Sequence, residues 1–256
     1  MIGCIIQARM GSTRLPGKIL KKVHNDIPSF QYTINQLGFS KNIDKIVIAT
    51  TKLVEDDVIE KFANEQNLDC FRGSVENVLD RYYQCAKKFE FDGIVRITSD
   101  CPLIDPSITD EVIQAYTSGV YDYVSNVFPR TFPTGTETEV INNKALEIAW
   151  KNAKLPSEKE HVTPYFKNNK EKFRIRNVKN DINLSHLRWA LDYEEDLKLI
   201  KEILNKISTN PIYMKDILEL FDNEPNLPKI NKNNPTPIER YQECLKEDGK
   251  LLRKNQ

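Results

Sequence analysis

Three cationic side chains follow the first apolar segment of the sequence in a single short loop: Arg9, Arg14 and Lys18. The loop also contains Gly11 and Gly17, which permit a close approach of the backbone to a ligand. The first 25 residues include no Asp or Glu, so the loop creates a local positive field. Together with the backbone N–H groups of Gly11 and Ser12, these cations indicate a phosphate site. A solvated basic loop is the alternative interpretation.

This loop does not match the common phosphate-binding motifs. A Walker A motif places four residues between its glycines and a Ser or Thr after its Lys. Here five residues separate Gly11 from Gly17, and Ile19 follows Lys18. Pro16 also lacks an N–H that could face a phosphate. The G-x-G-x-x-G pattern is absent too, which disfavours a nicotinamide-dependent enzyme.

Two acidic residues lie where predicted strands end. Asp100 follows the strand that we expect over residues 93–98, and Asp192 lies at a predicted strand-to-helix junction. Ligands of open α/β sheets bind beyond the carboxyl ends of the strands, so both carboxylates can reach the crevice that the first loop borders. Two carboxylates beside a polyphosphate suit Mg²⁺. Ordinary helix capping is the alternative interpretation for each of them.

Apolar runs rich in β-branched residues alternate with helical patterns in the first half of the chain. We expect strands over residues 2–7, 45–50, 68–71 and 93–98. We expect helices over residues 28–37, 54–67 and 74–89. This alternation predicts an α/β fold with a parallel sheet and helices on both of its faces.

The second half of the chain is less regular. Helices are expected over residues 105–117, 143–153, 158–167, 194–207 and 215–221, and strands over residues 122–126, 137–141, 173–178 and 187–191. We expect one domain over residues 1–222. From residue 222 the chain is rich in Asn and Pro, so we predict an irregular extension over residues 223–256.

The composition excludes several classes of protein. The chain of 256 residues is 39% hydrophobic and 29% charged, which is typical of a globular protein. Its 37 Lys and Arg balance its 37 Asp and Glu, which counts against nucleic acid as the main partner. It has no apolar run of transmembrane length, and its N-terminus lacks the basic lead of a signal peptide. Five widely spaced cysteines indicate reduced thiols and a cytoplasmic location, with no membrane partner.

Seven patterns occur in a recognisable order along the sequence. It reads I-x-Q-A-R-M-G-S-T-R-L-P-G-K-x-L over 5–20, R-G-S-x-x-x-V-L-D-R-Y over 72–82, R-x-T-x-D-C-P-L-I-D-P over 96–106, Y-x-Y-V-S-N over 121–126, G-x-x-x-E-V over 135–140, E-H-V-T-P over 160–164 and D-x-x-x-D-L over 192–197. In this series the chain resembles the cytidylyltransferase family that activates acidic sugars. The resemblance is strongest to the branch named after the spore-coat polysaccharide biosynthesis protein F.

The resemblance implies a fold, a donor and a set of site residues. The fold would be nucleotide-diphospho-sugar-transferase-like (Rossmann-like), with a mixed, mostly parallel sheet flanked by helices. CTP would be the donor and Mg²⁺ the cofactor. Arg9 and Lys18 would hold the triphosphate, and Asp100 and Asp192 would hold Mg²⁺. Three residues would lie near the cytosine and ribose: Ala8, Arg72 and Ser74.

The acceptor side is less defined. An acidic sugar would need a cation, which makes Arg130 a candidate, with Asn126 and Glu139 as further polar candidates in the matched segments. His161 either binds or deprotonates the acceptor, or is a structural histidine. Residues 127–180 would be insertions on the acceptor side or at a dimer interface, and the resemblance implies a homodimer.

The predicted reaction is the transfer of CMP from CTP to a sugar or sugar acid for surface polysaccharide synthesis, with release of pyrophosphate. The chain departs from the branch at Ser99 and at Glu137, and the second departure concerns the sugar pocket more than the chemistry. A glycosyltransferase of the same fold is a rival, although the D-x-D metal motif is absent around Asp100. A nucleotidyltransferase that uses another nucleoside triphosphate is a second rival. A catalytically inactive binding subunit is disfavoured because the cations and acids occur together.

Overall fold

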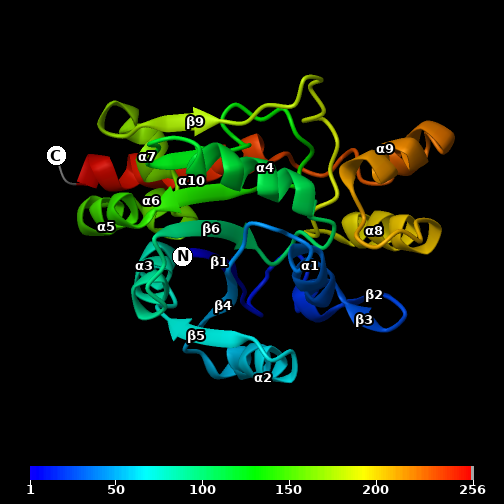
Figure 1. The fold of residues 1–256 in the computed structure, drawn as a ribbon, viewed down its shortest axis with the longest axis horizontal. Helices are drawn as coiled ribbons and strands as arrows, with labels where there is room; N and C mark the ends of the chain where they lie inside the picture. Colours follow the sequence, from blue (N-terminus) through cyan, green and yellow to red (C-terminus); the bar gives the residue numbers. More distant parts are fainter. Residues whose placement is uncertain (255–256) are drawn as a thin grey trace.

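The computed structural model describes residues 1–254 and contains a seven-stranded sheet between helices (Figure 1). The strand order is β5-β4-β1-β6-β8-β7-β9, and a separate hairpin pairs β2 with β3. The strands are β1 (Ile2–Gln7), β2 (Lys22–His24), β3 (Ile27–Pro28), β4 (Lys45–Thr51), β5 (Asp69–Gly73), β6 (Gly93–Thr98), β7 (Tyr123–Ser125), β8 (Glu139–Asn142) and β9 (Ile175–Asn177).

The central strand β1 sets the position of the site. It pairs in parallel with β4 on one side and with β6 on the other, and its last residue, Gln7, lies opposite Ala49 and Thr98. The loops that follow these three strands therefore leave the sheet at the same edge. Beyond β6 the sheet changes direction, because β8 is antiparallel to both β6 and β7, and β9 is parallel to β7. The expected mixed and mostly parallel sheet is confirmed.

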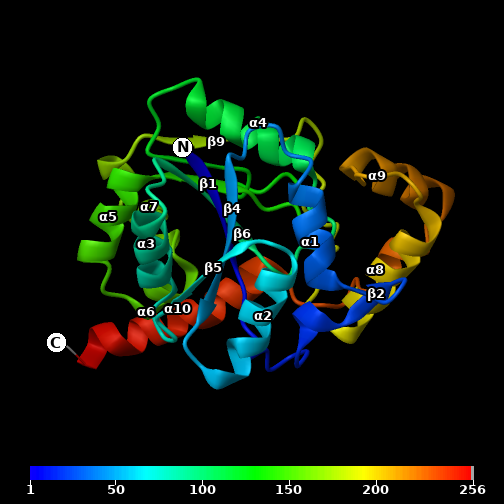
Figure 2. The ribbon, with the colours of Figure 1, turned by 60° about the horizontal axis from the view of Figure 1, so that its bottom comes forward.

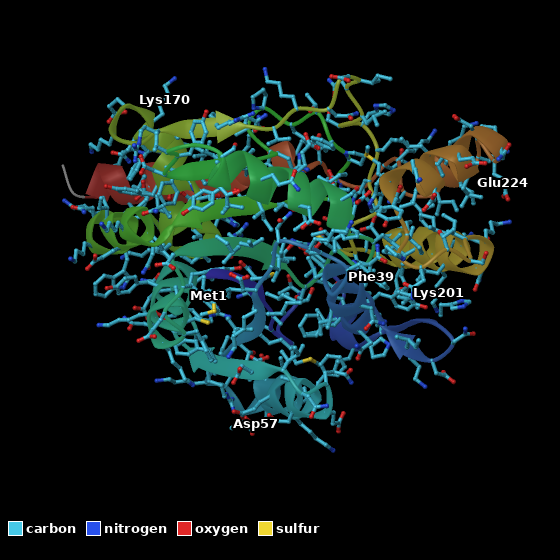
Figure 3. The ribbon with its side chains drawn as sticks, in the orientation of Figure 1. Met1, Phe39, Asp57, Lys170, Lys201 and Glu224 are labelled. Carbon is cyan, nitrogen blue, oxygen red and sulfur yellow. The ribbon has the colours of Figure 1, made fainter. Side chains whose placement is uncertain are left out.

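Two layers of helices bury the two faces of the sheet. In the turned view, α3 and α5 lie on one side of the strands and α1 and α4 on the other (Figure 2). Their apolar side chains fill the space against the sheet, whereas Lys170 and Lys201 lie on the outside (Figure 3). The α-helices are α1 (Ser29–Leu37), α2 (Asp57–Glu65), α3 (Val78–Lys88), α4 (Pro106–Thr117), α5 (Asn143–Asn152), α6 (Pro156–His161), α7 (Pro164–Asn168), α8 (Glu194–Lys206), α9 (Met214–Asn223) and α10 (Pro237–Lys254).

A third apolar cluster packs α8 and α9 against the segment after β1. Leu15 and Val23 from that segment contact this cluster, and Trp189 lies within it, fully buried. The segment after β1 includes the short helix η1 (Lys18–Leu20), which follows Gly17 in a left-handed conformation with φ of 64°. Because only glycine adopts this conformation without strain, Gly17 sets the turn that presents Lys18 to the site. The cluster thus joins the first loop to the later part of the chain.

The structure corrects three expectations from the sequence. The C-terminal segment is not irregular throughout, because α10 packs against α6, where Ser157 donates to Asp248 at 2.5 Å. Residues 187–191 form no strand, only an isolated bridge from Arg188 to Thr134. The expected helix over 158–167 is divided into α6 and α7 at Val162, whose φ is 68°. Across residues 1–254, no helix has both the length and the apolar character needed to cross a membrane.

A buried ion pair marks the point where the sheet changes direction. Arg96 of β6 lies opposite Glu139 of β8 in register, and the two side chains form a salt bridge with 11% and 4% of their surface exposed. Tyr123 of β7 also donates its hydroxyl to Glu139. Burial alone would raise the pKa of Glu139, but the charges of Arg96 and Lys167 outweigh it and lower the pKa to about 2. Glu139 therefore holds three elements together as a carboxylate.

We predict that Glu139→Gln lowers the free energy of unfolding at pH 7 by about 3 kcal/mol, because it leaves Arg96 buried beside a neutral group. The folded pKa of about 2 lies below the ordinary value of 4.5. The carboxylate therefore stabilises the fold above pH 4.5, and this contribution is lost as the pH falls toward 2. Urea unfolding measured against pH checks this. The wild-type protein should lose stability more steeply than the variant in that window, and the exposed control Glu219→Gln should follow the wild type.

Candidate active site

Lys18, Asp100 and Asp192 converge at the carboxyl edge of the sheet. The Nζ atom of Lys18 lies 2.7 Å from Oδ2 of Asp100 and 2.8 Å from Oδ1 of Asp192. Because both oxygens contact the same nitrogen, the two carboxylates lie side by side although 92 positions separate them in the sequence. The expectation that both acids reach the crevice beside the first loop agrees with this geometry. Lys18 lies between the two acids rather than opposite them.

Backbone hydrogen bonds fix the segments that carry these side chains. Ser99 N donates to Gln7 O at 3.1 Å, which ties the loop of Asp100 to the end of β1. Leu191 N donates to Asp100 O at 2.8 Å, which brings the segment of Asp192 to the same loop. The N-terminus of α8 is capped by Asp196, whose carboxylate accepts from the backbone N–H groups of Asp192 and Tyr193. The capping that was the alternative for Asp192 thus falls to Asp196.

Three cations surround the carboxylate of Asp192, which is 1% exposed. Arg14 and Lys18 both contact its Oδ1, at 2.7 and 2.8 Å, and Arg188 donates to its Oδ2. Arg188 also contacts Asp196, so that its own charge is matched by two acids. A buried carboxylate is costly unless it is paired, and here the protein supplies more than one partner.

Neighbouring opposite charges in this cluster shift the pKa values of Lys18, Asp100 and Arg188 toward their ionised forms. Burial lowers the pKa of Lys18, but the adjacent Asp100 and Asp192 outweigh burial and raise it. Burial likewise opposes ionisation of Asp100, but Lys18 outweighs it and lowers the pKa of that carboxyl. The pKa of Arg188 is also raised, since Asp196 and Asp192 outweigh its burial. Lys18, Asp100 and Arg188 are therefore charged at neutral pH.

The donor set of the cluster fits Mg²⁺. Asp100 and Asp192 offer hard carboxylate oxygens that already share one cationic neighbour, the ammonium of Lys18. Among residues 1–254, no group of three or more His, Cys, Asp and Glu side chains is arranged to hold a metal ion. A site built from only two carboxylates suits an ion that also takes phosphate oxygens and water as ligands. Zinc-like closed sites, which use four protein ligands, do not fit these residues.

Asp56, in the segment after β4, anchors the first loop. Asp56 is fully buried and accepts hydrogen bonds from Met10 N and from the hydroxyl of Thr51. Ser12 N donates to Met10 O at 2.7 Å, so this amide of the expected phosphate nest is engaged within the loop. Gly11 lies beside Glu55, whose Oε1 would be 3.1 Å from a Cβ at that position. Glu55 therefore offsets part of the positive field that the sequence predicts.

The other nucleotide residues expected from the sequence are dispersed around the carboxyl edge. Arg9 is half exposed and lies 3.9 Å from Glu160 at the end of α6. Ala8 is buried, and its N–H donates to Ala49 O. Ser74 accepts from Asn77 N at the start of α3. Their roles toward a nucleotide stay predictions.

All three guanidinium nitrogens of Arg72 contact other groups of the protein. Its Nη1 contacts the carboxylates of Asp57 and Glu60 of α2. Its Nε donates to Thr51 O at 2.9 Å and its Nη2 to Leu53 O at 2.7 Å. In this arrangement Arg72 fastens β5 to the segment after β4, and a contact with cytosine would require it to leave these partners.

The acceptor candidates divide into two groups. Arg130 pairs with Glu137 at 2.7 Å, and Glu137 lies 3.7 Å from the thiol of Cys101, next to Asp100. Arg130 is thus near the carboxylate cluster. Asn126 and Glu139, by contrast, are buried and hold the sheet and its loop: Asn126 bridges Thr136 O and Thr138 N, and Glu139 pairs with Arg96.

His161 lies against the C-terminal helix. Its Nε2 is 3.1 Å from the Sγ of Cys244, and its ring packs edge-on toward Tyr241. This contact with α10 supports the structural alternative for His161.

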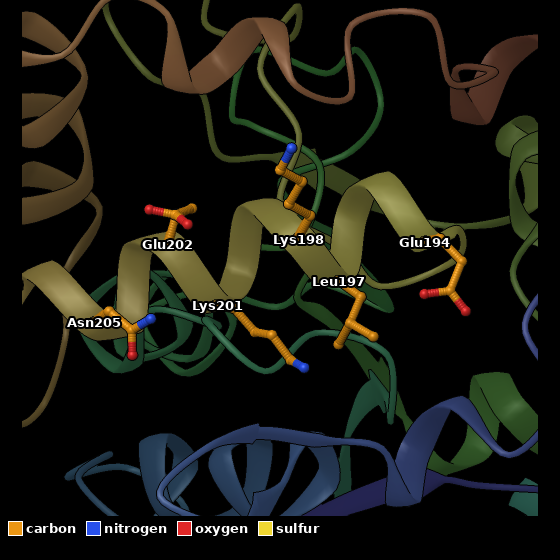
Figure 4. A pocket seen from close by; sticks show the side chains of 6 residues that line it. All are labelled: Glu194, Leu197, Lys198, Lys201, Glu202 and Asn205. Atoms are coloured by element: carbon orange, nitrogen blue, oxygen red, sulfur yellow. The ribbon is translucent and has the colours of Figure 1, made fainter.

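The sequence reasoning did not predict the full membership of the cluster: Arg14 was expected only as a cation toward phosphate, and Asp196 was not singled out. Arg14, Arg188 and Asp196 all belong to the carboxylate cluster, and Glu137 connects it with Arg130. The D-x-x-x-D-L pattern contained Asp196, and its spacing of four residues was the available indication that a second acid faces the same arginine. A pocket of about 300 Å³ lies elsewhere, along the exposed face of α8 (Figure 4). We place the site at the cluster because the buried charges are there.

Comparisons with known proteins agree with this geometry. The family model described as cytidylyltransferase matches residues 3–241. The spore coat polysaccharide biosynthesis protein SpsF of Bacillus subtilis is 33% identical over 230 residues, covering 86% of this chain and 94% of that protein. An uncharacterized protein of Methanocaldococcus jannaschii is 36% identical over 231 residues, covering 90% of this chain and 93% of that protein.

A solved structure of similar fold supports the same assignment. A cytidylyltransferase from Leptospira borgpetersenii has a TM-score of 0.85 and 34% identity, and the match covers 91% of this chain and 98% of that one. The overall fold of this chain is therefore similar to that of a cytidylyltransferase. On these findings, the chain is a member of the cytidylyltransferase family, a family of CTP-dependent nucleotidyltransferases.

Proposed function

We propose that the protein transfers CMP from CTP to a hydroxyl group of a sugar or sugar acid, with Mg²⁺ as cofactor. The observation that carries this proposal is the contact of Lys18 with both Asp100 and Asp192. One ammonium group between two carboxylates, at the edge where open α/β sheets bind ligands, suits a substrate that brings phosphates and a metal ion together. When bound, Mg²⁺ would neutralise charge on the phosphate oxygens.

Lys18 has a specific role in this proposal. Its ammonium is 12% exposed and held by two acids, so it keeps its charge in the absence of nucleotide. Asp100 and Asp192 would hold the metal ion, and Lys18 would then contact the β- and γ-phosphates as a point charge. Arg14 is 40% exposed and can follow the same phosphates, whereas Arg188 stays behind Asp192 and keeps its carboxylate in place.

The reaction needs positioning and charge neutralisation more than covalent catalysis. An acceptor oxygen attacks the α-phosphorus in line, and the bond from that phosphorus to the oxygen bridging to the β-phosphorus breaks. Pyrophosphate leaves with the electron pair, and the hydroxyl proton passes to water. Lys18 and Arg14 stabilise the charge that develops on the leaving group.

The acceptor is proposed from the surroundings of Asp100. Arg130 and Glu137 form a pair with 15% and 21% of their surfaces exposed, close enough to Asp100 to border the acceptor. A guanidinium and a carboxylate side by side can bind a sugar's hydroxyl groups, and the guanidinium can also bind a carboxylate. The name of the Bacillus subtilis relative supports a role in surface polysaccharide synthesis. The homodimer and the cytoplasmic location stay predictions.

We predict that the protein releases pyrophosphate from CTP in the presence of Mg²⁺ and a sugar-acid acceptor. The measurement is a coupled pyrophosphate assay with CTP, UTP, GTP and ATP, each with a panel of neutral and acidic sugars. Release with CTP alone among the four is the expected result. Equal release with all four would contradict CTP as the donor, and sugar transfer from a nucleotide sugar without pyrophosphate would show a glycosyltransferase instead.

We predict that Asp100→Asn lowers kcat by about 100-fold or more, because the amide offers the metal ion a neutral oxygen in place of a carboxylate. The melting temperature should change little, since Asp100 is only partly buried and Lys18 keeps Asp192. Steady-state kinetics at several Mg²⁺ concentrations and a thermal unfolding curve check both statements. The control is Asp222→Asn, on the exposed face of α9. Unchanged turnover in Asp100→Asn would remove Asp100 from the site.

We predict that Lys18→Ala weakens binding of CTP by about 10-fold or more, with a change of less than about 3-fold for CMP, because Lys18 contacts phosphates that CMP lacks. Isothermal titration of both nucleotides in the presence of Mg²⁺ is the measurement. Lys201→Ala, an exposed lysine on α8, is the matched control. Equal losses for the two nucleotides would place Lys18 elsewhere.

A further inference from the structure

Arg81 of α3 is a buried cation with no ion-pair partner among the residues that the structure describes. Its side chain belongs to a residue that is 2% exposed, and its Nε is buried with no hydrogen-bond partner. Within residues 1–254, no hydrogen bond or salt bridge of its guanidinium is observed. The other buried arginines differ, since Arg96 pairs with Glu139 and Arg188 with Asp192 and Asp196. An unpaired buried charge is costly, so a partner from outside the chain would account for it.

The side chain of Arg81 reaches the edge of the sheet where the site lies. Arg81 is in the first turn of α3, whose N-terminus follows the loop after β5. Side chains on a helix lean toward its N-terminus, so Arg81 leans toward the carboxyl ends of the strands. Gly73, the last residue of β5, allows this placement, because a Cβ there would lie 2.9 Å from Cγ of Arg81.

The charges around Arg81 indicate that its missing partner is an anion. Burial lowers the pKa of Arg81, and Arg9 lowers it further, while Tyr82 and Asp56 act in the opposite direction. Asp56 is already committed to Met10 N and Thr51. Arg9 has an acid only at 3.9 Å, in Glu160. The like charges of Arg9 and Arg81 thus oppose each other with little negative charge to match them, which favours an anion that both can contact.

We propose that Arg81, together with Arg9, binds the α-phosphate of the nucleotide. This inference rests on the proposed function and adds a binding residue to it. Arg81 comes seven residues after Ser74, which is expected near the nucleoside, while Lys18 is expected at the β- and γ-phosphates. The phosphate between these two ends is the one attached to the nucleoside. A guanidinium fork grips two oxygens of one phosphate, which also positions the phosphorus for attack.

A ligand-binding Arg81 and a structural arginine differ in what their replacement does to stability. A structural arginine loses bonds when it is replaced, so the free protein becomes less stable. Arg81 has no such bonds in the free protein, and Met fills a similar volume without the cost of a buried charge. Arg81→Met should therefore leave the melting temperature of the free protein unchanged or higher, while nucleotide binding falls. This combination is typical of residues kept for function at a cost in stability.

The experiment is isothermal titration of CTP, CMP and cytidine, with thermal unfolding of each free variant. We expect Arg81→Met to weaken both CTP and CMP by about 30-fold or more, and cytidine by less than about 3-fold. Arg81→Lys, which keeps the charge but loses the fork, should lie between the wild type and Arg81→Met. Arg176→Met, an exposed arginine of β9, is the control for a lost surface charge.

Three results would overturn the proposal. An equal loss for cytidine would place Arg81 at the base, and a lower melting temperature with unchanged binding would make it a structural residue. Wild-type turnover of CTP by Arg81→Met would also overturn it, while leaving the proposed function intact. If instead the wild-type protein binds CTP and CMP through Arg81 but releases no pyrophosphate with any acceptor, the proposed function fails and the assignment of Arg81 stands.

Discussion

The compensation of buried charge at one edge of a parallel sheet is the constraint on which this site depends. Asp192 is 1% exposed, and a carboxylate buried to this degree is costly unless it is paired, as it is here with Arg14, Lys18 and Arg188. Those partners come from the first loop and from the segment before α8, which are far apart in the sequence. The apolar cluster that packs α8 and α9 against Leu15 and Val23 is what brings them together. The fold therefore positions the site through packing outside the sheet as well as through the strand ends.

The two regions proposed to bind the nucleotide's phosphates differ in how the chain compensates the charge of their cations. At Lys18 the chain supplies its own carboxylates, so the cation is held ready and can exchange one set of oxygens for another. At Arg81 the chain supplies no carboxylate within hydrogen-bonding distance among the described residues. The partner of this guanidinium would be the bound nucleotide. The first arrangement stabilises the free protein, and the second favours the bound state. Together they favour a nucleotide that extends from the loop after β5 to the loop after β1.

The sequence predicted the parts of the site that lie at strand ends. Lys18 and Asp100 follow β1 and β6, whose apolar runs are readable without the structure, and parallel neighbours bring their loops to one edge. Arg72 and His161 could not be assigned in the same way, because their partners Asp57 and Cys244 are set by tertiary packing. The C-terminal helix α10 was missed because Asn and Pro before it dominate the local pattern, and its contact through Asp248 depends on α6.

The most direct test is a crystal structure of the protein with CTP and Mg²⁺. The account predicts a metal ion in contact with carboxylate oxygens of both Asp100 and Asp192, with Lys18 moved from these acids onto the terminal phosphates. Arg81 should then face the phosphate attached to the nucleoside. A nucleotide bound away from the carboxyl edge of the sheet would contradict the account. So would a bound CTP beside which Lys18 still bridges the two aspartates.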